Sequence, residues 1–252
     1  MKISTIVDHL EQYFPFAIQE TWDRSGLQIG NLDGEANKVM VSLNCDLAAV
    51  EKAIENGCEL LVTHHPFLLN KFDNYDTGTA YTRILEKALK HNLTVVSFHT
   101  CLDRGIIGVS MNYWLISKLP VGEIKNYDET GIGKMAILDN EYDFDGFVEL
   151  AKNRFGLETV RTNELSGKKI RSVAICGGSG FDDINKLFGK VDCFISGDCK
   201  YHQGQVATEN NLAVIDASHH LEVIMELEVA KMLSCFELEI ITAGCTDYLQ
   251  VK

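Results

Sequence analysis

The sequence predicts an α/β protein made of two similar lobes, each a mixed sheet flanked by helices. Short apolar runs typical of buried strands alternate with amphipathic stretches typical of helices. This alternation occurs twice, first from residue 38 and again from residue 170. Polar side chains follow several of the strands directly, at the edge where parallel α/β sheets bind their ligands. We therefore expect a functional site in the cleft between two related lobes.

Composition narrows the class of protein. The chain has 252 residues, of which 46% are hydrophobic, and this is enough to build one large or two small cores. A formal net charge of −13 argues against DNA or RNA as a partner. No apolar run approaches the roughly 20 residues of a membrane span. The eight cysteines form no C-x-x-C pair, and the N-terminus lacks a signal-peptide pattern. We expect a cytoplasmic protein with reduced thiols and no membrane partner.

The first lobe is predicted over residues 1–123. Its expected helices cover 4–14, 47–56, 80–91 and 109–118, and its expected strands cover 27–29, 39–43, 59–63 and 93–98. Ser4 or Thr5 can cap the first helix and Asp46 the second, while Gly57 ends the second helix. The polar segment 70–79 is predicted as a loop.

The second lobe is predicted over residues 124–252, and the alternation of strands and helices is less regular over residues 119–170. Its expected helices cover 145–155, 181–188, 203–209 and 222–235, and its expected strands cover 160–162, 170–176, 191–196, 212–216 and 239–242. The last helix and strand could instead pack back on the first lobe. The segment 177–180 (GGSG) lacks the Lys-Ser/Thr tail of a phosphate loop, so we interpret it as a tight turn.

An internal repeat relates the two lobes. The segment 92–96 (NLTVV) aligns with 211–215 (NLAVI), an offset of 119 residues (211 minus 92). The same offset carries Asp103 onto Glu222. Each lobe is therefore predicted to supply a carboxylate from one topological position, just after its last repeated strand.

Histidines and acids at the strand ends indicate a metal site. The apolar run 60–63 stops at His64 and His65, and Pro66 then prevents the strand from continuing. Asp103 and His219 follow later strands in the same way. Imidazole and carboxylate together suit zinc, iron, manganese, nickel or cobalt. Because adjacent side chains on an extended chain point in opposite directions, His64 and His65 are expected to serve different ions. Two metals with Asp103 as a bridging ligand are the economical arrangement.

Several assignments stay open at the level of sequence. Glu222 lies three residues after His219, on one face of a helix that starts there, and Glu226 is the fallback ligand. His220 could replace His219. His99 either binds a metal or orients a ligand.

Further polar residues near the strand ends are candidates for other tasks. Tyr201 and His202 are the candidate proton donors, and Lys200 is the nearby cation that could bind a phosphate. Asp23 is either a turn residue or lies near the site. Cys101 would put a thiol beside the ligands, which would make the site redox-sensitive.

The chain resembles the GTP cyclohydrolase 1 type 2 homologue family (the Nif-three-like proteins) over nearly its full length. The resemblance rests on the segments 22–30 (WDRSGLQIG), 63–66 (THHP), 99–103 (HTCLD), 195–202 (ISGDCKYH) and 216–219 (DASH). It implies two similar α/β lobes, a dinuclear divalent-metal site and a ring-shaped homohexamer. The family ligands carry over to His64, His65, Asp103 and His219.

The chain departs from the family pattern at the fifth ligand. The family has Gly-His-x-x-x-Glu, whereas this chain has Ser218 before His219 and Val223 four residues after it. Either Glu222 substitutes, as the repeat suggests, or one ligand is lost.

The resemblance and the site chemistry leave two classes of function. The family name implies a metal-dependent hydrolase acting on a nucleotide-like small molecule. The alternative is a metal-binding or metal-handling protein that acts through partners without turnover.

Overall fold

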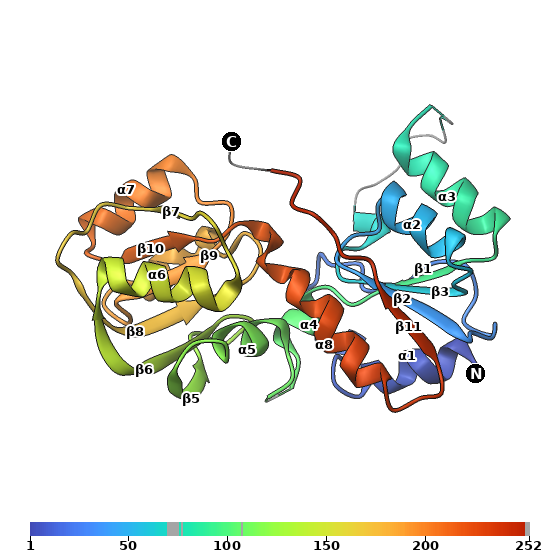
Figure 1. Ribbon diagram of the computed structural model, residues 1–252, viewed down its shortest axis with the longest axis horizontal. Coiled ribbons are helices and arrows are strands. Elements are labelled where there is room, and N and C mark those ends of the chain that lie inside the picture. Colours follow the sequence, from blue (N-terminus) through green and yellow to red (C-terminus); the bar gives the residue numbers. More distant parts are fainter. Residues whose placement is uncertain (70–75, 77, 107, 250–252) are drawn as a thin grey trace. The chain divides into compact units, whose positions relative to one another are not determined.

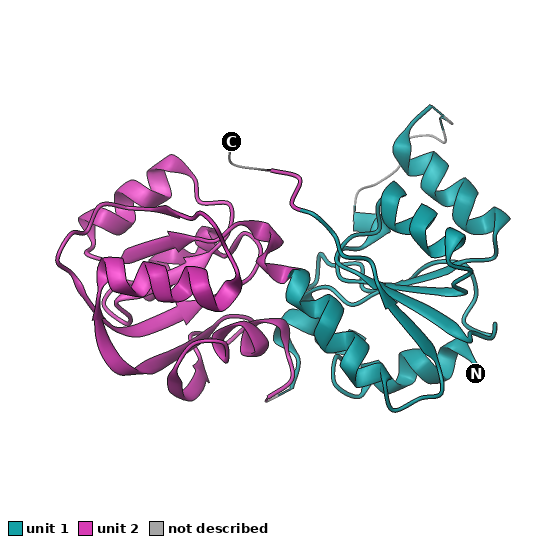
Figure 2. Cartoon of the chain, viewed as in Figure 1, with its two compact units in different colours: residues 1–106, 223–246 teal, residues 107–222, 247–252 magenta. Residues whose placement is uncertain are grey.

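The chain folds into two compact units. The computed structural model describes residues 1–69, 76, 78–106 and 108–249. Unit 1 comprises Met1–Ile106 and Val223–Thr246, and unit 2 comprises Ile107–Glu222 and Asp247–Lys252 (Figure 2). The division therefore follows residue 106, not residue 123 as the sequence suggested. The last helix and strand belong to unit 1, which is the alternative that the sequence left open.

Unit 1 contains a five-stranded sheet in the order β1-β4-β3-β2-β11 (Figure 1). Strands β2, β3, β4 and β11 are parallel, and β1 pairs antiparallel with β4. The strands are β1 (Gly26–Ile29), β2 (Lys38–Ser42), β3 (Leu60–Thr63), β4 (Thr94–Ser97) and β11 (Glu239–Thr242). The α-helices are α1 (Ile3–Glu11), α2 (Leu47–Glu55), α3 (Ala80–Lys90), α4 (Thr100–Arg104) and α8 (Ile224–Leu233), and short 3-10 turns occur at η1 (Phe16–Ile18) and η2 (Phe67–Leu69).

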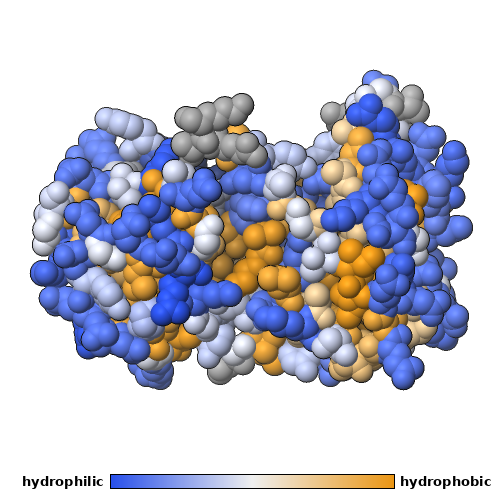
Figure 3. All heavy atoms as spheres, in the orientation of Figure 1, coloured by the Kyte–Doolittle hydropathy of each residue, from blue (hydrophilic) through white to orange (hydrophobic). Residues whose placement is uncertain are grey.

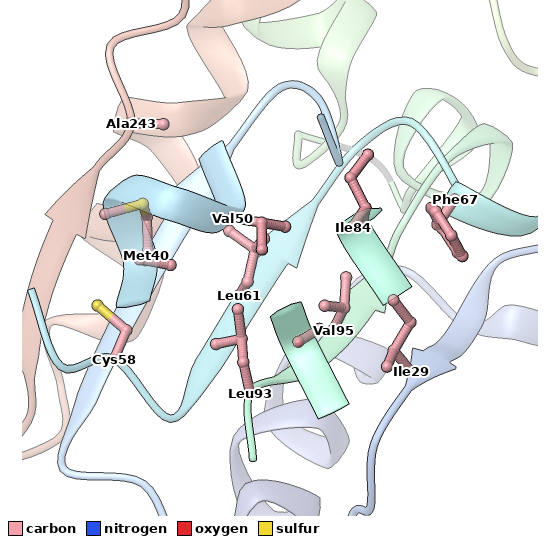
Figure 4. Packing of buried hydrophobic residues seen from close by; sticks show 12 residues of the cluster. Ile29, Met40, Val50, Cys58, Leu61, Phe67, Ile84, Leu93, Val95 and Ala243 are labelled. Atoms are coloured by element: carbon pink, nitrogen blue, oxygen red, sulfur yellow. The ribbon is translucent and has the colours of Figure 1, made fainter. Parts of the chain in front are cut away.

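The core of unit 1 explains why its strands are apolar throughout. Met40, Leu61 and Val95 project from neighbouring strands into one cluster with Val50 of α2 and Ile84 of α3 (Figure 4). Their chain neighbours project to the other face, where α8 packs against β2 and β11. Because helices cover both faces, strands β3 and β4 are buried at every position.

Unit 2 contains a six-stranded sheet in the order β5-β6-β8-β9-β10-β7. Strands β8, β9 and β10 are parallel, and the remaining pairings are antiparallel. The strands are β5 (Val121–Asn126), β6 (Lys134–Asp143), β7 (Arg161–Thr162), β8 (Lys169–Ile175), β9 (Cys193–Ser196) and β10 (Ala213–Asp216). The helices are α5 (Met111–Ile116), α6 (Phe144–Phe155), η3 (Gly180–Leu187), α7 (Tyr201–Glu209) and η4 (His219–Val223), the two η elements being 3-10 helices.

The two units share the topology of their central strands, as the predicted duplication requires, and the predicted α/β fold class is confirmed. They differ at one edge, where unit 1 has the parallel strand β11 and unit 2 has the antiparallel strands β5 and β6. Each has three parallel strands joined by helices, with an earlier strand added antiparallel beside the third (β1 beside β4, β7 beside β10). The offset of 119 residues holds for whole elements. It relates β4 to β10 (213 minus 94) and α4 to η4 (219 minus 100). Asn92 and Asn211 have the same left-handed backbone, with φ of 53° and 55°.

Three sequence-based expectations were wrong in detail. The first helix starts at Ile3 with Lys2 as its N-cap, so neither Ser4 nor Thr5 caps it. The passage after residue 119 contains the antiparallel pair β5 and β6. The segment predicted as a helix at 181–188 is the 3-10 helix η3. By contrast, Asp46 caps α2 by accepting a hydrogen bond from the Ala49 amide, as predicted.

The surface agrees with the composition. The face shown in Figure 3 is mostly hydrophilic, with apolar patches between the polar side chains. Among the described helices, none has the length and apolarity needed to cross a membrane. Most of the predicted loop at 70–79 lies outside the described residues.

Candidate metal centre

His64 and His65 lie at the carboxyl edge of the sheet in unit 1. Strand β3 ends at Thr63, and the backbone amides of His64 and His65 still pair with the carbonyls of Ser42 and Leu43. His64 is fully buried and donates from Nδ1 to the Phe98 carbonyl at 2.8 Å. His65 donates from Nδ1 to Asn44 Oδ1 at 2.7 Å. Each imidazole is therefore held through Nδ1, which leaves Nε2 as the atom that can bind a metal.

His99 follows the neighbouring strand β4 and joins the same cluster. Its ring lies 5.0 Å from the His64 ring and 5.8 Å from the His65 ring, measured between centroids. It donates from Nδ1 to Asp23 Oδ1 at 2.9 Å. Asp23 is thus part of the site, where it orients a histidine, and is more than a turn residue.

The three histidines of unit 1 can serve one ion together. One ring nitrogen of each of His64, His65 and His99 lies within 4.8 Å of the other two. The centroids of the His64 and His65 rings are 5.0 Å apart, so the two side chains do not point in opposite directions. That the two histidines serve different ions stays a prediction.

Asp103 approaches this cluster from α4. Its Oδ1 lies 3.7 Å from His64 Nε2, and both side chains are largely buried. Two ligands bound about 2.1 Å from one tetrahedral ion are separated by about 3.4 Å. The separation between Asp103 and His64 therefore suits a shared cation better than a direct hydrogen bond.

In unit 2, His219 and Glu222 form a second histidine–carboxylate pair. They lie on the 3-10 helix η4, in which residues three apart are eclipsed. His219 Nε2 is 3.2 Å from Glu222 Oε2, again close to the separation of two ligands on one ion. It is therefore His219, not His220, that lies beside Glu222. The acid follows the histidine by three residues here and by four in the family pattern, and a 3-10 helix, with three residues per turn, brings residues three apart onto one side.

Carboxylates control the protonation of His219. Its Nδ1 donates to Asp198 Oδ2 at 2.6 Å. The Glu222 carboxylate, and after it the Asp198 carboxylate, raise the pKa of His219 to about 10 against the opposing effect of burial. A cation bound by Nε2 would replace this proton.

The glycine-rich segment 177–180 is more than a tight turn. A Cβ on Gly178 would lie 2.8 Å from Glu222 Oε1 and 3.4 Å from His219 Nε2, and one on Gly177 would lie 2.9 Å from Glu222 Cγ. Glycine therefore lets the main chain approach the second pair closely. The GGSG motif is visible in the sequence, but we compared it only with a phosphate loop and interpreted it as a tight turn.

The structure removes two alternatives. Glu226 of α8 accepts hydrogen bonds from the amides of Leu43, Gly244 and Cys245, so its carboxylate stabilises the backbone of unit 1. Cys101 is fully buried, and burial raises the pKa of its thiol to about 12; both features disfavour the accessible thiolate that a redox-sensitive site needs.

Tyr201 and His202, the predicted proton donors, begin helix α7 and are exposed. Tyr201 lines a cavity of about 660 Å³ in unit 2, together with Arg161 and Lys200. Lys200 Nζ pairs with Asp182 Oδ1 at 2.7 Å. Neither Tyr201 nor His202 belongs to the groups of metal-binding side chains found among the described residues.

Two supporting residues were not predicted from the sequence as parts of the site. Asn44 follows β2, and Asp198 follows β9 at the position that aligns with His65 in unit 1. The rule that parallel strands collect functional groups at their carboxyl ends could have indicated both.

Comparison with known proteins agrees with this architecture. A protein named GTP cyclohydrolase 1 type 2 homolog from Campylobacter jejuni is 32% identical over 219 residues, which cover 87% of this chain and 86% of that protein. A Helicobacter pylori protein named GTP cyclohydrolase 1 type 2 is 28% identical, with 96% of each chain covered. The crystal structure of a Bacillus cereus protein related to NIF3 superposes with a TM-score of 0.94 at 19% identity, over 100% of this chain and 99% of that one.

A family model also matches residues 1–246, which is nearly the whole chain. Its description is Duf34/NIF3 (NGG1p interacting factor 3). The sequence-based assignment to the Nif-three-like proteins is thus confirmed, and the chain belongs to the Duf34/NIF3 family.

Proposed function

We propose that the chain is a dinuclear divalent-metal-binding protein that acts as a metal-dependent hydrolase on a nucleotide-like small molecule. The observation that carries the proposal is that each unit has a histidine–carboxylate pair at ligand spacing. These pairs are His64 with Asp103 and His219 with Glu222. The name of the Helicobacter pylori relative supports the nucleotide class of substrate.

The proposed ligands are the five residues predicted from the sequence. They are His64, His65, Asp103, His219 and Glu222, and the ions are two of zinc, iron, manganese, nickel or cobalt. Asn44 and Asp198 orient His65 and His219 through Nδ1. His99 lies close enough to add a nitrogen in unit 1. Bound divalent ions would supply Lewis-acid polarisation of the substrate and acidify water for attack.

Proton transfer is assigned to His202 or Tyr201, which begin helix α7 shortly after the ligand-orienting Asp198. Replacing the true donor should lower kcat by about 10²- to 10⁴-fold without changing metal content. His202→Gln and Tyr201→Phe, assayed in parallel, identify which of them it is. If neither variant slows turnover, this assignment fails.

Elemental analysis of the purified protein tests the metal centre. We expect about two divalent ions per chain. The double variant His64→Ala/Asp103→Ala should abolish this binding, and full retention of metal in that variant would overturn the site. Hydrolysis of a panel of nucleotides by the metal-loaded protein then tests the activity.

A metal-handling protein without turnover is the second candidate. The pairing of Lys200 with Asp182 favours it, because this cation is already engaged and is less available for a substrate phosphate. Full metal occupancy with no hydrolysis of any nucleotide in the panel would select this function. The ring-shaped homohexamer, expected in the cytoplasm, is also part of our proposal, and sedimentation equilibrium of the metal-loaded protein tests the assembly.

A further inference from the structure

Trp22 is a large aromatic side chain left exposed beside the histidine cluster of unit 1. The residue is 57% exposed. The indole meets the His99 ring at a centroid distance of 5.7 Å and an interplanar angle of 74°. A perpendicular contact of this kind covers at most one of the two indole faces. An open aromatic face therefore lies next to a candidate metal ligand.

The loop that carries Trp22 is held in place by hydrogen bonds of the residues that precede and follow Trp22 in the sequence. The Glu20 amide donates to Thr100 Oγ1 at 2.9 Å, and the Ser25 amide donates to Gln19 Oε1 at 2.9 Å. The Asp23 carboxylate accepts from the Thr100 amide at 2.9 Å as well as from His99. The loop is thus tied to the His99 segment without help from the indole. Burial in the core does not account for a tryptophan at this position.

Topology places this loop at the edge of the sheet where the histidines project. Strand β1 runs antiparallel to β4, with Gly26 opposite Ser97, so the residues before β1 lie at the carboxyl end of β4. Gln28, which is buried, donates to the Arg24 and Gly26 carbonyls and accepts from the Leu68 amide. One side chain therefore joins the Trp22 loop to the turn that follows His65.

We propose that Trp22 is a stacking platform that holds the flat heteroaromatic ring of the substrate beside the metal-binding histidines. This inference rests on the proposed function and adds to it a residue that selects for a planar ring. An indole offers a rigid π-face, and stacking on such a face tolerates any nucleobase while rejecting compounds that have no ring. Trp22 is in this sense a specificity-determining residue, distinct from the metal ligands.

The test compares two probes that differ only by the base. GMP carries a nucleobase, whereas ribose 5-phosphate has the same sugar and phosphate without it. Affinities for both are measured by calorimetry on zinc-loaded protein. Trp22→Leu should weaken GMP binding about tenfold or more and leave ribose 5-phosphate unchanged, while Trp22→Phe should retain most of the GMP affinity. Leu89→Ala is the matched control, because Leu89 on α3 is 55% exposed and lies outside the site.

Fluorescence gives a second readout. The chain has two tryptophans, so Trp114→Phe leaves Trp22 as the single indole. GMP should quench its emission, and ribose 5-phosphate should not.

Three results would overturn the inference. The first is equal weakening of both probes by Trp22→Leu. The second is loss of zinc from that variant, which would make Trp22 a support for His99. The third is dissociation of an oligomer, which would mean that a second copy of the chain covers the indole.

Inference and proposed function can fail separately. Tryptophan-dependent GMP binding without hydrolysis would leave the inference standing and reject the hydrolase. Nucleotide hydrolysis that is unaffected by Trp22→Leu would support the hydrolase and reject the role of Trp22.

Discussion

At the scale of single residues, two buried glutamates four positions apart have different roles. Glu222 faces His219, whereas Glu226 accepts three backbone amides. We predict that Glu222→Gln lowers metal occupancy with little loss of stability. Glu226→Gln should keep the metal and cost about 1–3 kcal/mol of unfolding free energy, because the NH2 group that replaces one carboxylate oxygen cannot accept a hydrogen bond from a buried amide. Metal analysis and urea denaturation of both variants check this, and the reverse pattern would reject the assignment of Glu222.

Asp23 gives the site a pH-dependent support. Burial would raise the pKa of its carboxyl, but hydrogen bonds from His99 and Thr100 outweigh burial and hold it well below the ordinary value. Stability from this group is therefore full above the unfolded pKa of about 3.9 and is lost as the pH falls below it. Asp23→Asn should cost about 1.5–3 kcal/mol at pH 7 and flatten the acid limb of the stability curve.

Urea denaturation of the metal-free protein from pH 3 to pH 7 measures the effect of Asp23. Asp8→Asn, at an exposed carboxylate of α1, serves as the control and should leave the curve unchanged. An acid limb as steep in Asp23→Asn as in the wild-type protein would show that Asp23 is not its source.

The candidate ligands could be predicted from sequence because histidines at strand ends are a local signal. The residues that orient them could not be predicted as readily. Asn44 contacts His65 and Asp198 contacts His219, each 21 positions away in the chain. A local sequence pattern does not predict which residues at this separation will be in contact. The eclipsed geometry of His219 and Glu222 also required the structure, since a spacing of three fits both an α-helix and a 3-10 helix.

At the scale of elements, the strands that could be predicted from the sequence are the ones that are buried. Strands β3 and β4 are buried throughout and were predicted to within two residues. Strand β5 has no fully buried position, and β6 is exposed over most of its second half, so neither shows a clear apolar run. The repeat was visible because Asn92 and Asn211 end helices in the left-handed conformation, which favours asparagine after glycine.

The connection between β8 and η3 offers a test of close packing against the site. Gly178 and Gly189 have positive φ of 62° and 71°, so alanine costs about 1 kcal/mol of backbone strain at either. Only at Gly178 does the new Cβ meet Glu222, while at Gly189 nothing lies within 4 Å. Gly178→Ala should therefore lower metal occupancy, and Gly189→Ala should not. Equal metal content in the two variants would show that the approach of this segment to Glu222 is unimportant.

At the scale of the whole molecule, the duplication separates symmetric from asymmetric features. Asp103 and Glu222 come from equivalent positions on α4 and η4. His64 and His65 align with Gly197 and Asp198, and a Cβ on Gly197 would lie 2.4 Å from the His219 amide nitrogen. Unit 1 thus carries most of the candidate imidazole ligands, while unit 2 has at the equivalent positions a close main-chain approach and a carboxylate that orients one histidine.

This division of ligands predicts how metal affects unfolding. Each unit has its own apolar core and one tryptophan, Trp22 in unit 1 and Trp114 in unit 2. Trp114→Phe therefore reports on unit 1 and Trp22→Phe on unit 2. In metal-free protein the two variants should unfold at different urea concentrations. With metal at about 100 times its Kd, both transitions should move to higher urea and merge into one, because the proposed centre takes ligands from both units and each bound ion adds about 2.7 kcal/mol only while its ligands are folded.

The same experiment in the Glu222→Gln background provides the control. Removing the carboxylate of unit 2 should abolish the shift reported by Trp114 and leave at least part of the shift reported by Trp22, since the histidines of unit 1 remain. A metal-dependent shift confined to unit 1 in the otherwise unmodified chain would contradict the dinuclear proposal. It would instead indicate a single ion held by the cluster of His64, His65, His99 and Asp103.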